Sequence, residues 1–114
     1  MTAQKVVTKK SILLAYQLLR GMAPFNEWKL PTKVDTKVVH DASMYGCFDD
    51  PDLITISTGR VWDLNQLVAT VAHEMIHLRQ HRLKRLNADN PHDEFFMDCA
   101  RDVCVTLGFD KENF

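Results

Sequence analysis

Residues 73–77 of this 114-residue sequence read H-E-M-I-H, a pattern that can hold a metal ion and activate water. His73 and His77 are four positions apart, so on a helix their imidazoles lie one above the other on the same face. Glu74 is turned from His73 by about 100°, which places its carboxylate within reach of a water molecule on the ion. The motif therefore predicts a Zn²⁺ site in which His73 and His77 are metal ligands and Glu74 is the catalytic general base.

A catalytic zinc site needs a third protein ligand and keeps one position for water. His81 continues the series along the helix, but eight helical residues rise about 12 Å, too far for one ion with bonds of about 2.1 Å. His92 is the stronger candidate, because residues 83–89 can turn the chain and a new helix begins near residue 91. His40, on a predicted strand, is a more distant possibility.

Several predicted elements precede the motif. A helix is expected from about Thr8 to Gly21, with Thr8 or Ser11 as its cap and Gly21 at its end. Residues 34–40, 42–48 and 53–57 have strand character, and an acidic turn containing Pro51 joins the last two. The simplest arrangement is a three-stranded meander, which makes the sheet rich in antiparallel pairs.

Two further helices carry the candidate ligands. The first is expected over residues 64–86, with Asp63 and Gln66 as a capping box, and its apolar stripe comprises Leu64, Leu67, Val68, Val71 and Met75. The second is expected to begin with Asn90 as its N-cap and Pro91 at the first helical position, and to stop at Gly108. The order of elements predicts an α+β fold, formed by a single domain over residues 1–114.

Charge and hydropathy limit the possible partners. The formal net charge of −1 gives no general attraction to nucleic acid or to an anionic membrane. A weak nucleic-acid contact would have to use the basic stretch Arg79, Arg82, Lys84 and Arg85, which more simply stays solvated near a helix C-terminus. No segment approaches the roughly 20 apolar residues needed to cross a bilayer. We therefore expect a cytoplasmic protein with no membrane partner.

Other polar residues near the motif are weaker candidates for a role in it. Tyr45 and Arg60 could stabilise an oxyanion, although a plain surface position is the simpler interpretation of both. Asp93 or Asp98 could orient an imidazole through its second nitrogen. A peptide could bind by strand addition along residues 44–48 or 53–57, whichever forms the edge of the sheet.

The motif and the segment from Asn90 to Phe95 together resemble the SprT-like zinc metallopeptidase domain. That family has H-E-x-x-H on one helix and a third histidine in a following H-x-x-[FW]-like segment, which His92 and Phe95 match here. The upstream order of a helix and a hairpin is also similar. Asp93 stands where the family often has glycine, and no cysteine-rich zinc ribbon follows in this sequence.

The resemblance implies a zincin-like fold and a zinc metalloendopeptidase with protein or peptide as substrate. It implies His73, His77 and His92 as the metal ligands and Glu74 as the general base. The chain looks like a stand-alone catalytic core, of the sort that a bacterial or phage genome could encode. Two alternatives stay open: a non-catalytic, zinc-stabilised module that binds a partner protein, and a regulatory peptidase resembling the ImmA-type family, which cleaves a repressor.

Overall fold

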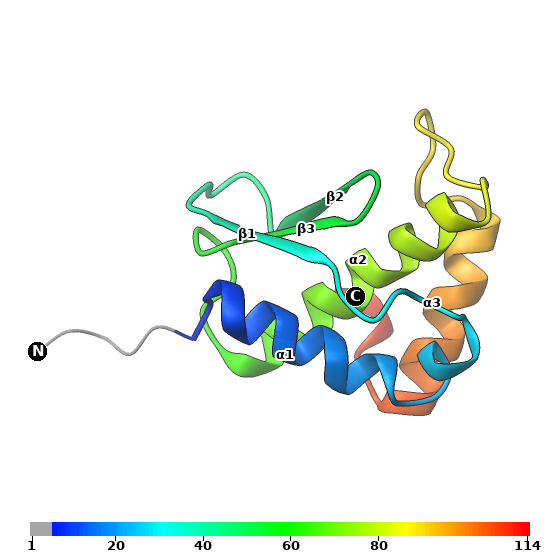
Figure 1. Ribbon diagram of the computed structural model, residues 1–114, viewed down its shortest axis with the longest axis horizontal. Coiled ribbons are helices and arrows are strands. Elements are labelled where there is room, and N and C mark those ends of the chain that lie inside the picture. Colours follow the sequence, from blue (N-terminus) through cyan, green and yellow to red (C-terminus); the bar gives the residue numbers. More distant parts are fainter. Residues whose placement is uncertain (1–5) are drawn as a thin grey trace, which may run out of the picture.

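A computed structural model describes residues 6–114, apart from the side chain of Asn113, and shows an α+β architecture (Figure 1). Within these residues there are three α-helices, two short 3₁₀ helices and a three-stranded mixed sheet. In chain order the elements are α1 (Lys9–Arg20), η1 (Phe25–Glu27), β1 (Asp35–Val39), β2 (Gly46–Asp49), β3 (Leu53–Ser57), α2 (Leu64–Arg82), α3 (Glu94–Leu107) and η2 (Lys111–Asn113). The α+β prediction is confirmed. The single-domain prediction stays a prediction, and its residues 1–5 lie outside the described part.

The strand order is β1-β3-β2, so the predicted meander is wrong. The β2–β3 hairpin is antiparallel as expected, but β1 pairs with β3 in parallel, with Thr36 opposite Ile54. The physical reason lies in the composition of the strands. Strand β3 is the most apolar and takes the central position, whereas β1 and β2 carry charged residues and lie at the edges, where charge discourages pairing with another chain.

Helices α1 and α2 contact each other and together cover one face of the sheet, while α3 packs against α2 away from the strands (Figure 1). Ile54 and Ile56 of β3 are fully buried in the core that these layers enclose. Helix α2 is therefore the central element, since the sheet, α1 and α3 all contact it. Within residues 6–114, each helix is too short or too polar to cross a membrane.

The predicted helix starts at α1 and α2 are confirmed by their capping boxes. The Thr8 side chain accepts a hydrogen bond from the Ser11 backbone, and the Ser11 side chain accepts one from the Thr8 backbone. Asp63 and Gln66 form the same reciprocal pair before α2. One residue of the predicted apolar stripe on α2 is misplaced, because Leu64 is largely exposed in the first turn.

Helix α2 ends at Arg82, four residues before the predicted end. Lys84 adopts a left-handed conformation with φ of 57°. The Lys84 N–H bonds to the His81 carbonyl and the Arg85 N–H to the Gln80 carbonyl. These two bonds form a Schellman motif, in which glycine is the usual left-handed residue. Because lysine occupies that position here, the sequence carries no signal for the stop.

The N-cap of α3 is Asp93, so the prediction of Asn90 is wrong by three residues. The Asp93 side chain accepts a hydrogen bond from the Phe96 N–H at 3.0 Å. Asn90 belongs to the preceding loop, in which the Asn87 side chain accepts hydrogen bonds from Asp89 and Asn90. His92 therefore lies in a loop directly before the helix and does not belong to its first turn. The predicted stop at Gly108 is confirmed by its left-handed φ of 83°.

Tyr16 anchors α1 to the segment before β1. Its side chain is fully buried, and its hydroxyl donates a hydrogen bond to the Pro31 carbonyl. Burial is the main reason why the pKa of Tyr16 is raised to about 12, although the positive charges of Arg20 and Arg82 oppose the shift. The phenol is thus held in its neutral, donating form.

Replacing Tyr16 with Phe should lower the free energy of unfolding by about 1 kcal/mol at pH 7, because the Pro31 carbonyl loses its donor. The tyrosine ionises near pH 10 in an unfolded chain but near 12 in the folded one. Its contribution is therefore present below about pH 10 and is lost as the pH rises toward 12. Chemical denaturation at several pH values checks this. A wild type and a Tyr16→Phe variant that lose stability equally above pH 10 would contradict it.

Candidate metal centre

Three histidine side chains converge on one point from two segments. His73 and His77 lie one turn apart on α2, and His92 is held against them by the loop that precedes α3. The Nε2 atom of His92 is 3.1 Å from Nε2 of His73 and 3.2 Å from Nε2 of His77. The structure thus brings together the three residues that the sequence predicts as ligands, close enough to bind a metal ion.

The spacing of the nitrogens fits a tetrahedral metal. Two ligands at about 2.05 Å from zinc, separated by a tetrahedral angle, are about 3.3 Å apart. The observed separations of 3.1 and 3.2 Å lie close to that value. Neutral imidazole carries one N–H and one lone pair, so three Nε2 atoms facing one another suit a shared cation well. In the described part of the chain, no other histidine, cysteine or acidic residue belongs to this group.

The surroundings of His73 and His77 keep both rings neutral. The pKa of His73 is lowered to about 3, chiefly by burial and to a smaller extent by the neighbouring His77 and His92, while a hydrogen bond with the Phe114 backbone opposes the shift. The pKa of His77 is also lowered, chiefly by burial, although a hydrogen bond to Gln80 opposes the shift. Because a metal binds the lone pair of neutral imidazole, this environment favours coordination.

Aromatic rings form an apolar wall for the site. The Phe96 ring on α3 lies against all three histidines, with centroid distances of 4.8 Å to His77, 4.9 Å to His73 and 4.5 Å to His92. Phe114 packs against His73 at 5.7 Å and against Phe109 at 5.5 Å. These rings exclude water from one side of the histidines, which accounts for the desolvation that keeps them neutral.

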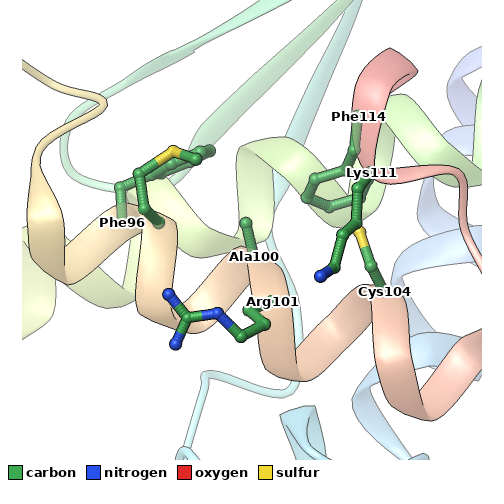
Figure 2. Close-up of a pocket in the computed structure, with 7 residues that line it drawn as sticks. Phe96, Ala100, Arg101, Cys104, Lys111 and Phe114 are labelled. Carbon is green, nitrogen blue, oxygen red and sulfur yellow. The ribbon is translucent and has the colours of Figure 1, made fainter.

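A smaller hollow of about 150 Å³, shown in Figure 2, borders two of these rings. The figure labels Phe96, Ala100, Arg101, Cys104, Lys111 and Phe114 along it. The hollow shares Phe96 and Phe114 with the histidine cluster but contains none of its histidines. It is well below the roughly 300 Å³ at which ligand pockets begin, so we assign it no role.

His73 and His92 open into a much larger cleft of about 1150 Å³. Its walls come from the segment before and at the start of β2, from the first half of α2, and from the chain that follows α3. The residues that line it include Met44, Tyr45, Gly46, Leu64, Val68, His73, Glu74, His92, Leu107, Phe109 and Phe114. A cleft of this size admits an extended chain segment as well as water.

Glu74 lies in the wall of the same cleft with only 4% of its surface exposed. Burial raises the pKa of Glu74 to about 8, and the negative charge of Asp49 contributes a smaller increase. A divalent cation held by the histidines would favour the carboxylate form, because an opposite charge lowers the pKa of an acid. The predicted general base is therefore placed beside the predicted ligands.

Gln80 belongs to the site but was missed by the sequence reasoning. Its side-chain oxygen lies 2.7 Å from Nδ1 of His77, on the opposite edge of the ring from the cluster. Its amide nitrogen donates to the Pro91 carbonyl at 2.9 Å and lies 3.5 Å from the Asp93 carboxylate. The sequence could have indicated this role, because Gln80 lies three residues after His77 and therefore on the same helical face.

The other candidates lie elsewhere or have different partners. His81 packs near Phe48, with ring centroids 5.8 Å apart, and His40 bonds to the Thr58 hydroxyl at 3.0 Å. Asp93 caps α3, and Asp98 forms a surface ion pair with Arg101 at 3.3 Å. Neither aspartate has an imidazole as its partner in these contacts.

Tyr45 and Arg60 contact each other, and Tyr45 also lines the cleft. In the basic stretch, Arg79 stacks over Trp28 and Phe95, and Arg85 also lies over Phe95. Both arginines therefore contact aromatic rings through their guanidinium groups. Arg82, Lys84 and Arg85 are exposed.

No family model, curated protein or solved structure matches the chain in comparisons with known proteins.

The chain should bind one Zn²⁺ or Co²⁺ ion, measured by isothermal titration calorimetry. Replacing His92 with Ala removes one of three converging ligands. We expect it to weaken binding by more than the roughly 10–100-fold that loss of an outer hydrogen-bond partner costs. His81→Ala is the matched control, since His81 is outside the group, and should bind like the wild type. Equal binding by His92→Ala and wild type would refute the three-histidine site.

Proposed function

We propose that this protein is a zinc-dependent peptidase that hydrolyses peptide bonds in protein or peptide substrates. His73, His77 and His92 would hold the ion, and Glu74 would act as the general base. The observation that carries the proposal is the convergence of three imidazole Nε2 atoms beside a cleft that His73, His92 and the buried Glu74 line. Three protein ligands with an open fourth position are typical of catalytic zinc.

The donor set favours zinc among the common metals. Imidazole nitrogen suits zinc well, whereas magnesium and calcium prefer oxygen ligands. When bound, zinc supplies an electrophilic centre that acidifies water at neutral pH. The three histidines direct their Nε2 atoms toward one another, and the Phe96 ring lies against all three imidazoles.

Glu74 provides the proton transfer that peptide hydrolysis requires. It follows His73 in the sequence and shares the cleft wall with it, so its carboxylate can accept a proton from an attacking water molecule. It can then deliver that proton to the leaving amine, which otherwise departs as an unstable anion. A glutamate has no such use in a site where the metal only holds the fold together.

The free edge of β2 offers a place for the substrate backbone. The Tyr45 carbonyl accepts a bond from Ser57, and Gly46 pairs with Ile56 in the antiparallel register. By the alternation of such ladders, Gly46 and Phe48 direct their backbone groups away from β3. Since Gly46 also lines the cleft, an extended peptide can add to this edge beside the histidines.

Gly46 allows β2 to approach α2 closely at this point. A Cβ atom there would lie 2.5 Å from the Thr55 carbonyl oxygen and 3.2 Å from the Thr70 side chain on α2. Thr70 is one turn before Glu74 on the same helix. The glycine thus allows the edge strand and the motif helix to line the same cleft.

A SprT-like, zincin-like identity is part of the proposal. It is supported by the order of elements, by H-E-x-x-H on a helix beside a sheet, and by a third histidine from the next segment. Phe95 follows His92 at the spacing that the resemblance requires, and its ring contacts Arg79 of the motif helix. Each of these features is observed in this chain itself.

The alternatives have less support from the site. A structural zinc is normally closed by a fourth protein ligand, and within residues 6–114 no such ligand joins the group. A nucleic-acid substrate is disfavoured, because no lysine or arginine is found among the described residues that line the cleft. An ImmA-like peptidase would use the same centre and differs only in cleaving a single repressor.

The test compares zinc-loaded wild type with Glu74→Gln on an unfolded protein such as casein and on a random peptide library. The variant should bind zinc and lose at least about 100-fold in kcat/KM, the lower limit for loss of a general base. Glu27→Gln, at an exposed position on η1, is the control and should cleave normally.

A Glu74→Gln variant that cleaves as fast as wild type would exclude the mechanism. A zinc-loaded wild type that cleaves none of these substrates would favour the partner-binding module. A folded repressor protein is assayed alongside these substrates, and cleavage confined to it would favour the ImmA-like alternative.

A further inference from the structure

We propose that Gln80 is a positioning residue that sets the tautomer of His77 and ties it to the loop that carries His92. The inference rests on the proposed metal site and assigns this residue a role that the motif does not include. Gln80 lies on the last full turn of α2, one helical turn beyond His77. Its amide is the link between the two segments that supply the converging histidines.

Gln80 is fully buried, although glutamine is usually found at the surface. A buried primary amide is tolerated only where its donors and acceptor find partners. Here the oxygen faces Nδ1 of His77 at 2.7 Å, and the nitrogen faces the Pro91 carbonyl at 2.9 Å. The Asp93 carboxylate lies 3.5 Å from the same nitrogen.

These contacts fix which end of the amide faces the histidine. A backbone carbonyl and a carboxylate can only accept hydrogen bonds, so the group that faces Pro91 and Asp93 must be the NH₂ donor. The Gln80 oxygen is then directed at Nδ1 of His77, and it can only accept. Nδ1 must therefore carry the proton in neutral His77, which leaves the lone pair on Nε2.

That tautomer is the one the cluster needs. Nε2 of His77 is the atom that lies 3.2 Å from Nε2 of His92. With its lone pair directed there, His77 can coordinate without first moving a proton between its nitrogens. A hydrogen bond from the second ring nitrogen also increases the basicity of the coordinating one.

The same side chain restrains the third histidine. Pro91, whose carbonyl Gln80 holds, directly precedes His92, and Asp93 directly follows it and caps α3. Gln80 thus holds His77 through its oxygen and the backbone beside His92 through its nitrogen. Glutamate in its place could accept from His77 but, as a carboxylate, could not donate to Pro91. Methionine, of similar length, could do neither.

The first experiment measures the tautomer in metal-free protein by long-range ¹H–¹⁵N NMR of the imidazole ring, at a pH where His77 is neutral. The wild type should show the proton on Nδ1 of His77. Gln80→Glu keeps the acceptor and should retain this tautomer. Gln80→Met removes it and should shift His77 toward protonation at Nε2. Gln17→Met, at an exposed position on α1, is the matched control and should match the wild type.

The second experiment measures Co²⁺ affinity by calorimetry for the same proteins. Gln80→Met should bind about 10–100-fold more weakly, as expected for loss of an outer-shell partner. Gln80→Glu should also bind more weakly despite its correct tautomer, because the loop beside His92 is released. Circular dichroism and a cooperative thermal transition establish that each variant is folded. If Gln80→Met does not fold, Gln80→Glu still decides the loop role and the wild-type spectrum decides the tautomer.

Two results would overturn the inference: Nε2 protonation of His77 in the wild type, or a folded Gln80→Met variant with wild-type tautomer and affinity. Wild-type affinity in folded Gln80→Glu would remove the loop role. None of these outcomes depends on peptidase activity. A wild type with the expected tautomer but no peptide cleavage would count against the proposed function and leave the role of Gln80 intact.

Discussion

Helix α2 is enclosed by the sheet, by α1 and by α3, so polar groups on it must find partners within the protein. Glu74, His77 and Gln80 are nevertheless buried on this helix. The Gln80 amide satisfies the hydrogen-bonding groups of two of these side chains, its own and that of His77. Its oxygen accepts a hydrogen bond from His77, and its nitrogen donates one to the Pro91 carbonyl in the loop before α3. The rest of the site depends on this bridge, because it determines how the loop with His92 meets the motif helix.

The order of the strands determines which edge of the sheet is available to a ligand. Had the sheet been the expected meander, β2 would have been central and its backbone groups would have been bonded on both sides. The observed order places the apolar β3 in the centre and leaves β2 with one free side. Gly46 brings the start of that edge close to α2, so backbone donors and acceptors lie in the same cleft as the histidines.

The features that the sequence predicted correctly are those determined by neighbouring residues. The capping box of Asp63 and Gln66, the strand from Leu53 to Ser57 and the H-E-x-x-H helix all follow from patterns within a few positions. His92 could be selected as the third candidate ligand because helix geometry excluded His81, and the structure places His92 beside His73 and His77. The parallel pairing of β1 with β3 depends instead on competition among distant strands for the central position, which local patterns do not encode.

The predicted C-terminal end of α2 and the predicted N-cap of α3 were wrong for a more local reason. The left-handed stop at Lys84 uses a residue that gives no indication of positive φ, and its bonds to α2 offset the strain. At α3, both Asn90 and Asp93 are good N-cap residues, and the sequence alone gives no clear preference between them. Tertiary contacts favour Asp93, because the Pro91 carbonyl is held by Gln80 and the chain can enter the helix only after His92.

Burial lowers the pKa of His73 and His77 and raises the pKa of Glu74, so in both cases it favours the neutral form. A bound cation would change this balance for Glu74. Exclusion of water by Phe96 and the core keeps His73 and His77 neutral, which preserves the lone pairs that a metal needs. The pKa of Glu74 is raised to about 8, chiefly by its own burial and to a smaller extent by Asp49, and this shift favours the protonated acid. Positive charge at the histidines favours the carboxylate and is itself favoured by it. A cation at the histidines would therefore hold Glu74 as the carboxylate that the proposed proton transfer requires, so the proposed metal binding and the proposed catalysis would depend on the same positive charge.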